Sequence, residues 1–332
     1  MKYLRLLFDD FTLALIAVVA AATWWPCEGN GAEFFAWLTR IAIGLLFFLH
    51  GAKLSSAALR SGAGHWRLHL VVFLCTFAMF PALGLALRPL AAPLLGEPLY
   101  LGVLFLCALP ATVQSAIAFT SIARGNVPAA ICSAAASSLL GIFITPLLVM
   151  LLMSVDGVGV HLDAIGKIAL QLFVPFAAGQ LARRWIGEWV NRNRSWLNRV
   201  DQASILLVVY TAFSDAVVQG IWRSVPPSRL IALALFCCLL LAIVLWATRA
   251  LALRLGFGIE DRITILFAGS KKSMATGVPM AQVMFAGSAV GVFILPLMMF
   301  HQIQLMVCAV LAQRLARRGE EAAPAVAILP VA

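Results

Sequence analysis

The sequence predicts an all-α polytopic membrane protein. Its 332 residues are 63% hydrophobic and only 11% charged, which is more apolar surface than a soluble fold of this size can bury. The apolar residues form long runs instead of the short alternating segments of a transmembrane β-barrel. Two lysines, Lys271 and Lys272, interrupt one of these runs. A lysine at membrane depth costs about 2.5–3.5 kcal/mol on insertion scales, so such residues usually mark an internal, hydrated site.

Ten apolar stretches are long enough to cross a bilayer, since each span needs about 20 residues. Joints rich in Pro or Gly, such as Arg88-Pro89 and Pro226-Pro227, separate most of them. The longest predicted loop, about 185–200, is basic and rich in Trp and Asn, and we expect it on the cytoplasmic leaflet. The predicted spans are residues 10–27, 34–55, 67–88, 98–122, 127–153, 163–184, 201–222, 228–252, 262–285 and 287–313.

The positive charges predict the orientation. With the N-terminus in the cytoplasm, sixteen of the 24 Lys and Arg residues lie in or beside cytoplasmic loops, and four lie on the outer side. This bias follows the positive-inside rule. It predicts a multi-pass protein of the cell (inner or plasma) membrane with both termini cytoplasmic. The formal charge of +10 is dispersed over short loops, which argues for the lipid bilayer and against nucleic acid as a partner.

A similarity between two segments of the sequence predicts two related halves. Residues 141–148, GIFITPLL, resemble residues 291–298, GVFILPLM. The two segments are five spans apart, so they must have opposite orientations in the membrane. Inverted repeats of this kind are common in secondary transporters. We therefore predict a first five-helix repeat over 1–153, an inverted second repeat over 154–318, and a disordered tail over 319–332.

Two predicted spans carry polar residues beside helix-breaking ones. Pro110 removes a backbone donor in the fourth span, and Gly269 precedes the lysine pair in the ninth. Discontinuous helices with polar breaks are typical of transporter binding sites; the alternative is a kinked helix with small residues for packing. The candidate substrate- or ion-binding residues are Thr112, Gln114, Ser115, Ser270, Lys271, Lys272, Ser273, Asp215 and Gln282, with His301, Gln302 and Gln304 as a weaker cluster.

Further charged residues leave alternatives open. Asp215 either pairs with a lysine or relays protons, or it is solvated near the outer interface. Lys53 is expected to snorkel to an interface, and His50 is either a packing residue or a proton carrier. Consecutive helical residues point about 100° apart. We therefore expect Lys272 to face the crossing point of the broken helices and Lys271 to face a cavity.

The polar motifs carry a family resemblance that covers the whole chain. The run 119–127, FTSIARGNV, the pairs Ser137-Ser138 and Thr145-Pro146, and the segments 112–120 and 269–279 resemble the bile acid/sodium symporter family, and more narrowly its sodium/bile acid cotransporter 7 branch. The resemblance implies ten helices in two inverted repeats. It also implies a core of spans 3–5 and 8–10, a panel of spans 1, 2, 6 and 7, broken crossing helices 4 and 9, and a substrate cavity between core and panel.

The sequence also departs from that family's sodium sites. Sodium-coupled members carry a Ser-Asn pair in span 4, Ser and Thr in span 5, and a Glu followed by Gln-Asn in span 9. The corresponding positions here are residues 114–117 (QSAI), Ala130, Ala134, Ala268 and the step Lys272-Ser273. Na⁺ prefers oxygen ligands, usually with a carboxylate. Our hypothesis is that a lysine ammonium takes the place of the cation, which makes transport sodium-independent or proton-linked.

The function predicted first is secondary transport of an organic anion or amphipathic solute, with H⁺ or Na⁺ as the candidate coupling ion. The alternative is a regulatory membrane protein that affects calcium or cell-envelope homeostasis without solute flux of its own. An enzyme is not expected, because the sequence holds no HExxH, GxSxG or paired membrane carboxylates. No cofactor and no metal centre are predicted.

Overall fold

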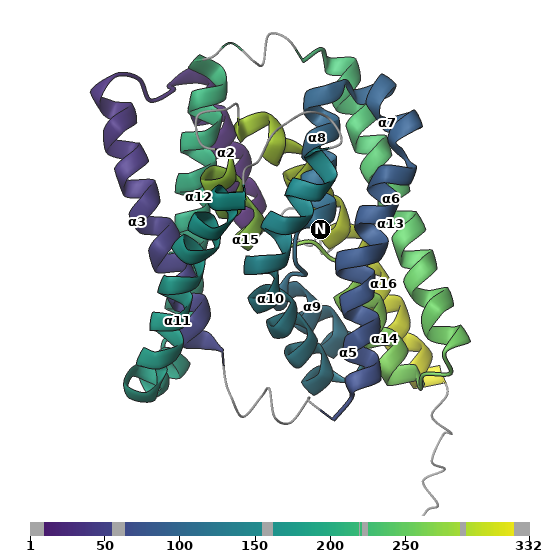
Figure 1. Cartoon of the computed structure of the whole chain (residues 1–332). Helices are drawn as coiled ribbons and strands as arrows, with labels where there is room; N and C mark the ends of the chain where they lie inside the picture. The colour runs from purple at the N-terminus through teal and green to yellow at the C-terminus, as the bar shows by residue number, and fades with distance from the viewer. Residues whose placement is uncertain are drawn as a thin grey trace, which may run out of the picture.

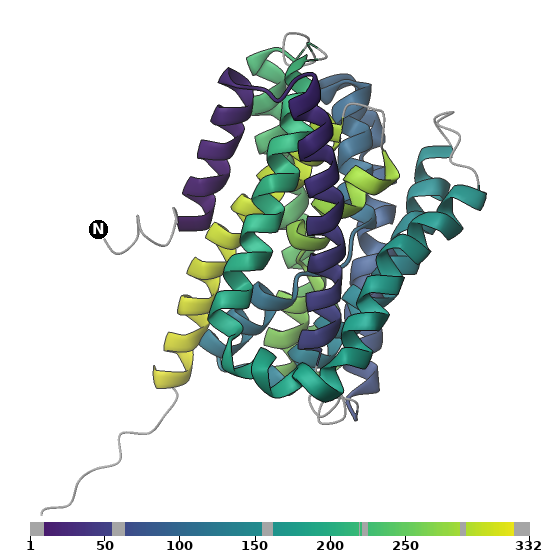
Figure 2. The same ribbon diagram turned by 90° about the vertical axis from the view of Figure 1, so that its left-hand side faces the viewer.

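The protein is helical throughout the part that can be described. The computed structural model describes residues 10–54, 64–154, 162–218, 220, 225–285 and 290–321, and between its helices these residues form only turns and short joints. The long helices run side by side in roughly one direction (Figures 1 and 2). The prediction of an all-helical membrane protein is confirmed.

Helix lies in every range where a span is predicted. The first half contains α2 (Asp10–Trp24), α3 (Asn30–Lys53), α5 (Trp66–Leu74), the π-helix η1 (Cys75–Met79), α6 (Phe80–Ala86), α7 (Arg88–Leu95), α8 (Glu97–Ala108), α9 (Val113–Ile122) and α10 (Val127–Ser154). The second half contains α11 (Leu162–Arg192), α12 (Arg194–Val218), α13 (Pro227–Arg254), α14 (Ile259–Gly269), α15 (Met274–Met284) and α16 (Val290–Glu321).

Length and apolar composition qualify fewer of these helices as spans than the sequence predicts. Among the described residues, 6 stretches of continuous helix are long and apolar enough to cross a membrane, and 7 if the bent pair α8–α9 counts as one span. The axes of α8 and α9 meet at 64°. The count of ten spans and the inverted repeat therefore stay predictions.

Both predicted helix interruptions are confirmed. α8 ends at Ala108 and α9 begins at Val113, while α14 ends at Gly269 and α15 begins at Met274. Ser273 caps α15, because its Oγ accepts a hydrogen bond from the Thr276 N–H at 3.3 Å. We call residues 109–112 the first break and residues 270–273 the second break. The backbone N–H of Ser273 donates to the carbonyl of Pro110 at 2.9 Å, so the two breaks are in direct contact.

The loop predicted at about 185–200 is instead a corner between two helices. α11 continues to Arg192 and α12 begins at Arg194, so only Asn193 separates them. The amide Nδ2 of Asn193 donates to the Trp189 carbonyl at 2.9 Å. Polar side chains do not by themselves end a helix, which explains the error. α16 likewise continues to Glu321, and the rest of the predicted tail lies outside the described residues.

The helices α2, α3, α11 and α12 gather on one side of the molecule, at the left of Figure 1. Two glycines let α3 and α11 approach backbone to backbone. A Cβ atom at Gly179 would lie 1.9 Å from the Phe48 carbonyl oxygen, and one at Gly51 would lie 2.0 Å from the Phe176 carbonyl oxygen. Only glycine fits these positions. A hydrogen bond of 2.9 Å between the hydroxyls of Thr39 and Thr211 also joins α3 to α12.

Candidate functional site

The contact between the two breaks is centred on Lys272. Its side chain is fully buried, and its ammonium donates to the backbone carbonyls of Thr76 at 2.8 Å, Cys107 at 2.8 Å and Leu109 at 2.6 Å. The ammonium also lies 4.2 Å from the centroid of the Phe80 ring, within the range of a cation–π interaction. An ammonium has three hydrogens to donate, so each of them has an oxygen acceptor.

The Thr76 carbonyl is available to Lys272 because of a π-turn and a proline. In an α-helix the N–H of Phe80 would bond to Thr76, four residues earlier. Here the Phe80 N–H bonds to the Cys75 carbonyl instead. Pro81 follows in the chain and has no N–H to offer. The local irregularity therefore exposes an acceptor that regular helix would use, as π-turns often do at functional sites.

The first break exposes the other two carbonyls, and α10 satisfies two of the backbone groups beside them. The N–H of Ala111, which a continuous helix would direct to the Cys107 carbonyl, donates to Ser137 Oγ at 3.0 Å. The Thr145 hydroxyl donates to the Ala108 carbonyl at 2.9 Å. Buried backbone groups need such partners. Two α10 hydroxyls thus hold the first break open for the lysine.

The second break is held by α16 through one fully buried amide. Gln304 Nε2 donates to the Lys272 carbonyl at 2.9 Å, and Gln304 Oε1 accepts from the Lys272 N–H at 3.0 Å. The Gln304 Nε2 also lies 2.9 Å from His301 Nδ1. The amide replaces the helical bonds that the break removes. Sequence reasoning ranked His301 and Gln304 below the breaks, yet they fix the position of Lys272.

Lys271 has different surroundings. Its side chain is fully buried, and its ammonium has no hydrogen-bond partner among the described residues. The ammonium lies 4.2 Å from the Phe119 ring centroid and 6.0 Å from that of Phe267. The Cys308 thiol lies close to the ammonium and interacts with it electrostatically. Lys271 is therefore enclosed by side chains, and it does not line the pocket found between α5 and α10, whereas it was expected to face a cavity. The angle of about 100° between consecutive side chains applies only within a helix, and the chain is not helical at the break.

We expect Lys271→Met to leave the protein at least as stable as wild type. The ammonium makes no hydrogen bond to an oxygen acceptor, and methionine fills similar space, can keep the contact with the Phe119 ring and leaves no uncompensated buried charge. The measurement is the midpoint of thermal unfolding of the purified protein in detergent. A clear fall in that midpoint would show that the ammonium has a stabilising partner after all.

The other predicted site residues are spread around the two breaks. Ser270 Oγ donates to the Leu266 carbonyl at 2.5 Å, which uses its hydroxyl within α14. Thr112 is buried at the start of α9. Ser115 Oγ and Gln282 Oε1 are buried polar atoms without a hydrogen-bond partner in the described part of the chain. These two have unused hydrogen-bonding capacity.

Asp215 does not pair with either lysine of the second break. It is half-buried on α12, and the ion pairs of the described residues do not include it. The carboxylate that does pair with a lysine is Asp201, at the other end of the same helix. Sequence reasoning placed Asp201 at the first position of a predicted span. A charged residue at the end of a span is expected at the membrane interface, and the sequence did not indicate its pairing with Lys53.

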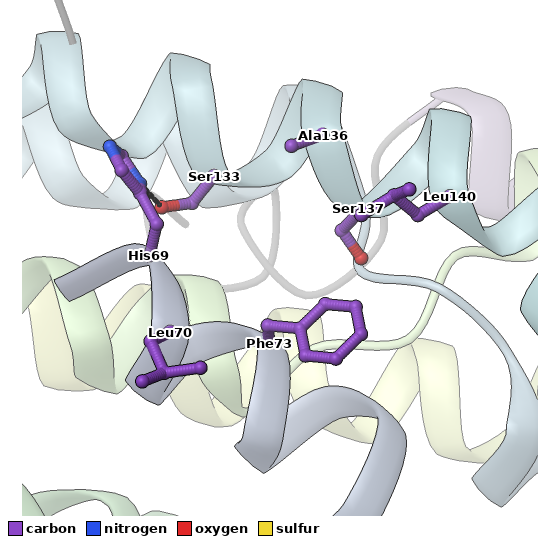
Figure 3. Close-up of a pocket in the computed structure, with 7 residues that line it drawn as sticks. All are labelled: His69, Leu70, Phe73, Ser133, Ala136, Ser137 and Leu140. Atoms are coloured by element: carbon purple, nitrogen blue, oxygen red, sulfur yellow. Dashed lines mark hydrogen bonds between the residues drawn. The ribbon is translucent and has the colours of Figure 1, made fainter. Parts of the chain in front are cut away.

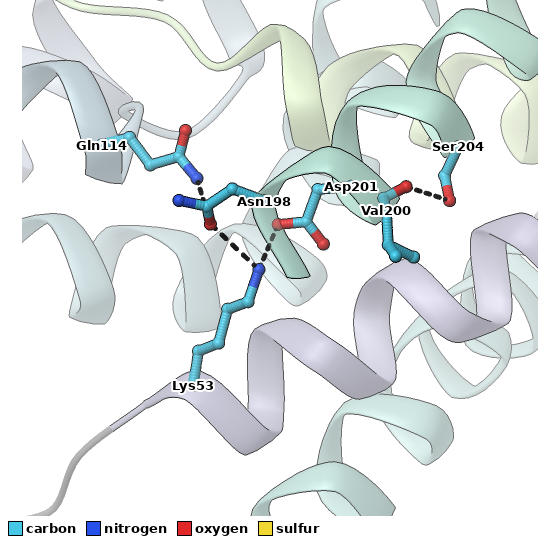
Figure 4. Close-up of polar contacts among 6 residues, drawn as sticks. All are labelled: Lys53, Gln114, Asn198, Val200, Asp201 and Ser204. Carbon is cyan, nitrogen blue, oxygen red and sulfur yellow. Dashed lines mark hydrogen bonds and ion pairs between the residues drawn. The ribbon is translucent and has the colours of Figure 1, made fainter. Parts of the chain in front are cut away.

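Lys53 contacts that carboxylate instead of snorkelling. Figure 4 shows its ammonium between Asp201 and Asn198 of α12, with Gln114 of α9 reaching the same asparagine. The distances to Asn198 Oδ1 are 3.3 Å from Lys53 Nζ and 3.3 Å from Gln114 Nε2. Of the predicted residues, Gln114 thus belongs to a second polar cluster, away from Lys272.

A pocket of about 280 Å³ lies between α5 and α10 (Figure 3). His69 Nδ1 is 2.7 Å from Ser133 Oγ on one side of it. Ser137, the hydroxyl that holds the first break, lines it too. The polar side chains are already bonded to one another or to backbone, and the remaining lining is Leu70, Phe73, Ala136 and Leu140. The pocket is therefore an apolar recess beside the break.

Interrupted helices whose breaks meet inside an all-helical membrane protein are characteristic of secondary transporters. The comparison of the sequence with family models agrees with this class. The chain belongs to the SBF-like CPA transporter family, whose model matches residues 9–317. It is thus a multi-pass membrane protein of a transporter family and not an enzyme.

Similar proteins cover nearly the whole chain. It is 66% identical to the uncharacterized protein PA2026 of Pseudomonas aeruginosa, over 98% of both sequences. It is 56% identical to the "Putative symporter YfeH" of Escherichia coli K12, over 97% of this chain and 96% of that one. It is 29% identical to sodium/bile acid cotransporter 7 of Xenopus tropicalis, over 92% and 91%. The resemblance seen in the sequence motifs is confirmed.

Proposed function

We propose that this protein is a secondary transporter of organic anions in which the Lys272 ammonium replaces a coupling cation, so that transport does not depend on Na⁺. The observation that carries the proposal is the cage of three carbonyls around that ammonium. Oxygen cages of this kind hold alkali cations in membrane proteins. Here the cage is filled by a charge that the chain itself supplies.

The arrangement of the helices supports a transport mechanism with a core and a panel. The helices α2, α3, α11 and α12, which gather on one side in Figure 1, are those of predicted spans 1, 2, 6 and 7. Both breaks lie in the other group, and each is held by the helix that follows its broken pair in the chain, α10 for the first break and α16 for the second. We propose that the two groups are the panel and the core of two inverted repeats, with both termini cytoplasmic in the cell membrane.

The solute class follows from charge and from the relatives. A relative that is 29% identical carries the name sodium/bile acid cotransporter 7. Two buried lysines, Lys271 and Lys272, lie at the second break, and neither forms an ion pair with a carboxylate among the described residues. A cationic interior favours an anionic solute. We therefore propose amphipathic organic anions as substrates, and cholate as the first probe.

The test is uptake of labelled cholate by proteoliposomes with Na⁺, or with choline in its place. We expect uptake by the wild type to be the same in both. The Lys272→Met variant is assayed in the same way. Its matched control is Lys271→Met, which carries the same substitution one residue away. Uptake that requires Na⁺ would overturn the cation replacement. Uptake that does not exceed that of protein-free liposomes would overturn transport of this solute class.

A further inference from the structure

The polar cluster of Figure 4, formed by Lys53, Gln114, Asn198 and Asp201, joins three helices at a partly exposed place. Lys53 stands in the last turn of α3, Asn198 and Asp201 in the first turns of α12, and Gln114 in the first turn of α9. Gln114 and Asn198 are exposed. The α9 residue belongs to the proposed core and the others to the proposed panel. The cluster therefore bridges the two groups of helices that transport would move apart.

The two members of the ion pair differ in their access to solvent. The side chain of Lys53 is 20% exposed and that of Asp201 is 5% exposed. One oxygen of Asp201, Oδ2, faces the ammonium, while Oδ1 is buried without a hydrogen-bond partner. The ammonium is thus the more accessible member of the pair. The carboxylate, by contrast, depends on Lys53 for its compensating charge.

We propose that Lys53 binds the carboxylate of the solute, and that Asp201 takes up the coupling proton when it loses Lys53. This rests on the proposed function for the solute class. The solute anion replaces Asp201 at the ammonium, an O–H bond forms on Asp201, and no other covalent bond changes. One anion and one proton enter together, so the net charge of the cluster is the same before and after. The amide N–H groups of Asn198 and Gln114 are further donors for the solute carboxylate.

The linkage follows from the cost of a buried, unpaired charge. The Asp201 side chain is almost wholly buried, so its carboxylate is costly to keep charged once it loses the paired ammonium. Protonation of Asp201 removes that charge, so anion binding strengthens proton binding, and by reciprocity proton binding strengthens anion binding. The cluster thereby couples the two ligands without any metal ion.

Other charged groups face this pair and must be tested with it. His50, one turn before Lys53 on α3, interacts electrostatically with both Lys53 and Asp201. Arg183 on α11 donates to the Ala52 carbonyl at 2.5 Å, and Arg194 lies near Arg183. The arginines stay charged at all relevant pH values. His50 is therefore the one competing proton acceptor among these neighbours.

The first experiment is infrared spectroscopy of the full-length protein in nanodiscs at neutral pH. Lys53→Met deprives Asp201 of the ammonium, as the binding of a solute to Lys53 would. We expect a carboxylic-acid carbonyl band in Lys53→Met that is missing from Lys53→Met/Asp201→Asn. The difference between these two spectra cancels every other acid, including Asp215. An absent band, or one that persists in the double variant, would overturn the proposal.

The second experiment needs no variant of Lys53 and so does not depend on that variant folding. Cholate is added to wild type in weakly buffered solution, and proton uptake is followed with a pH-sensitive dye against empty nanodiscs. We expect about one proton for each bound anion, and none in Asp201→Asn. Proton uptake that is lost in His50→Gln but kept in Asp201→Asn would overturn the proposal, and so would anion binding without protons. A sodium requirement in the liposome assay would overturn the proposed function but leave both of these results intact.

Discussion

Replacement of Lys272 by methionine is expected to lower the free energy of unfolding by about 3 kcal/mol or more, since each buried acceptor left without a donor costs about 1–3 kcal/mol. Methionine fills much of the same space but donates no hydrogen bond. The carbonyls of Thr76, Cys107 and Leu109 would then point into a site without a donor. The measurement is the thermal unfolding midpoint of the purified protein.

The neighbouring lysine is the control for this result. Lys271→Met makes the same chemical change at an equally buried position whose ammonium has no hydrogen-bond partner among the described residues. We therefore expect the unfolding midpoint to fall in Lys272→Met and to stay the same or rise in Lys271→Met. Equal losses in both would mean that burial of charge, and not the carbonyl cage, determines the effect.

Substitution of Gly179 by alanine is expected to cause the other large loss of stability, more than about 3 kcal/mol, at the upper end for overpacked sites. The new methyl group would lie 1.9 Å from the Phe48 carbonyl oxygen and 2.8 Å from its carbon. These are backbone atoms, so no side-chain rotation relieves the clash. The helices α3 and α11 would have to separate. The amount of monodisperse protein in size-exclusion chromatography, together with the unfolding midpoint, measures this effect.

Gly44 provides a matched control on the same pair of helices. It lies within α3, and a Cβ atom there would meet nothing within 4 Å. We expect Gly44→Ala to fold with wild-type yield, since alanine is the better helix former. If Gly179→Ala were as well behaved as Gly44→Ala, the close approach of α3 and α11 would not be required for folding.

The breaks were predictable because the chain marks them with residues that cannot continue a helix. Pro110 lacks an N–H, and Gly269 with the adjacent charged pair interrupts an apolar run. The inward position of Lys272 at the crossing is also the predicted one. The carbonyl cage was not predictable in the same way, because backbone atoms carry no residue identity. Pro81 is the one sequence signal for the free Thr76 carbonyl, and its meaning depends on the π-turn beside it.

The pairing of Lys53 with Asp201 shows a different limit. The two residues are 148 positions apart, and no local periodicity relates them. Their contact depends on how α3 packs against α12, which a single sequence does not specify. The same is true of Gly51 and Gly179, whose small size is visible in the sequence while their partners are not. Apolar patterns predict that a helix exists, but they do not say which helix lies next to it.

The tether of the Lys272 ammonium has a consequence for energy conversion. A sodium ion in a symporter enters its site from one side and leaves it on the other, and the work of transport comes from that passage. Under the proposed function, an amine fixed to the chain by four methylene groups takes the place of that ion and can never be released, so it dissipates no ion gradient. Under that function, the contact between the two breaks holds the same covalently attached group in every stage of the cycle. Any accumulation of solute must draw on a particle bound elsewhere in the protein.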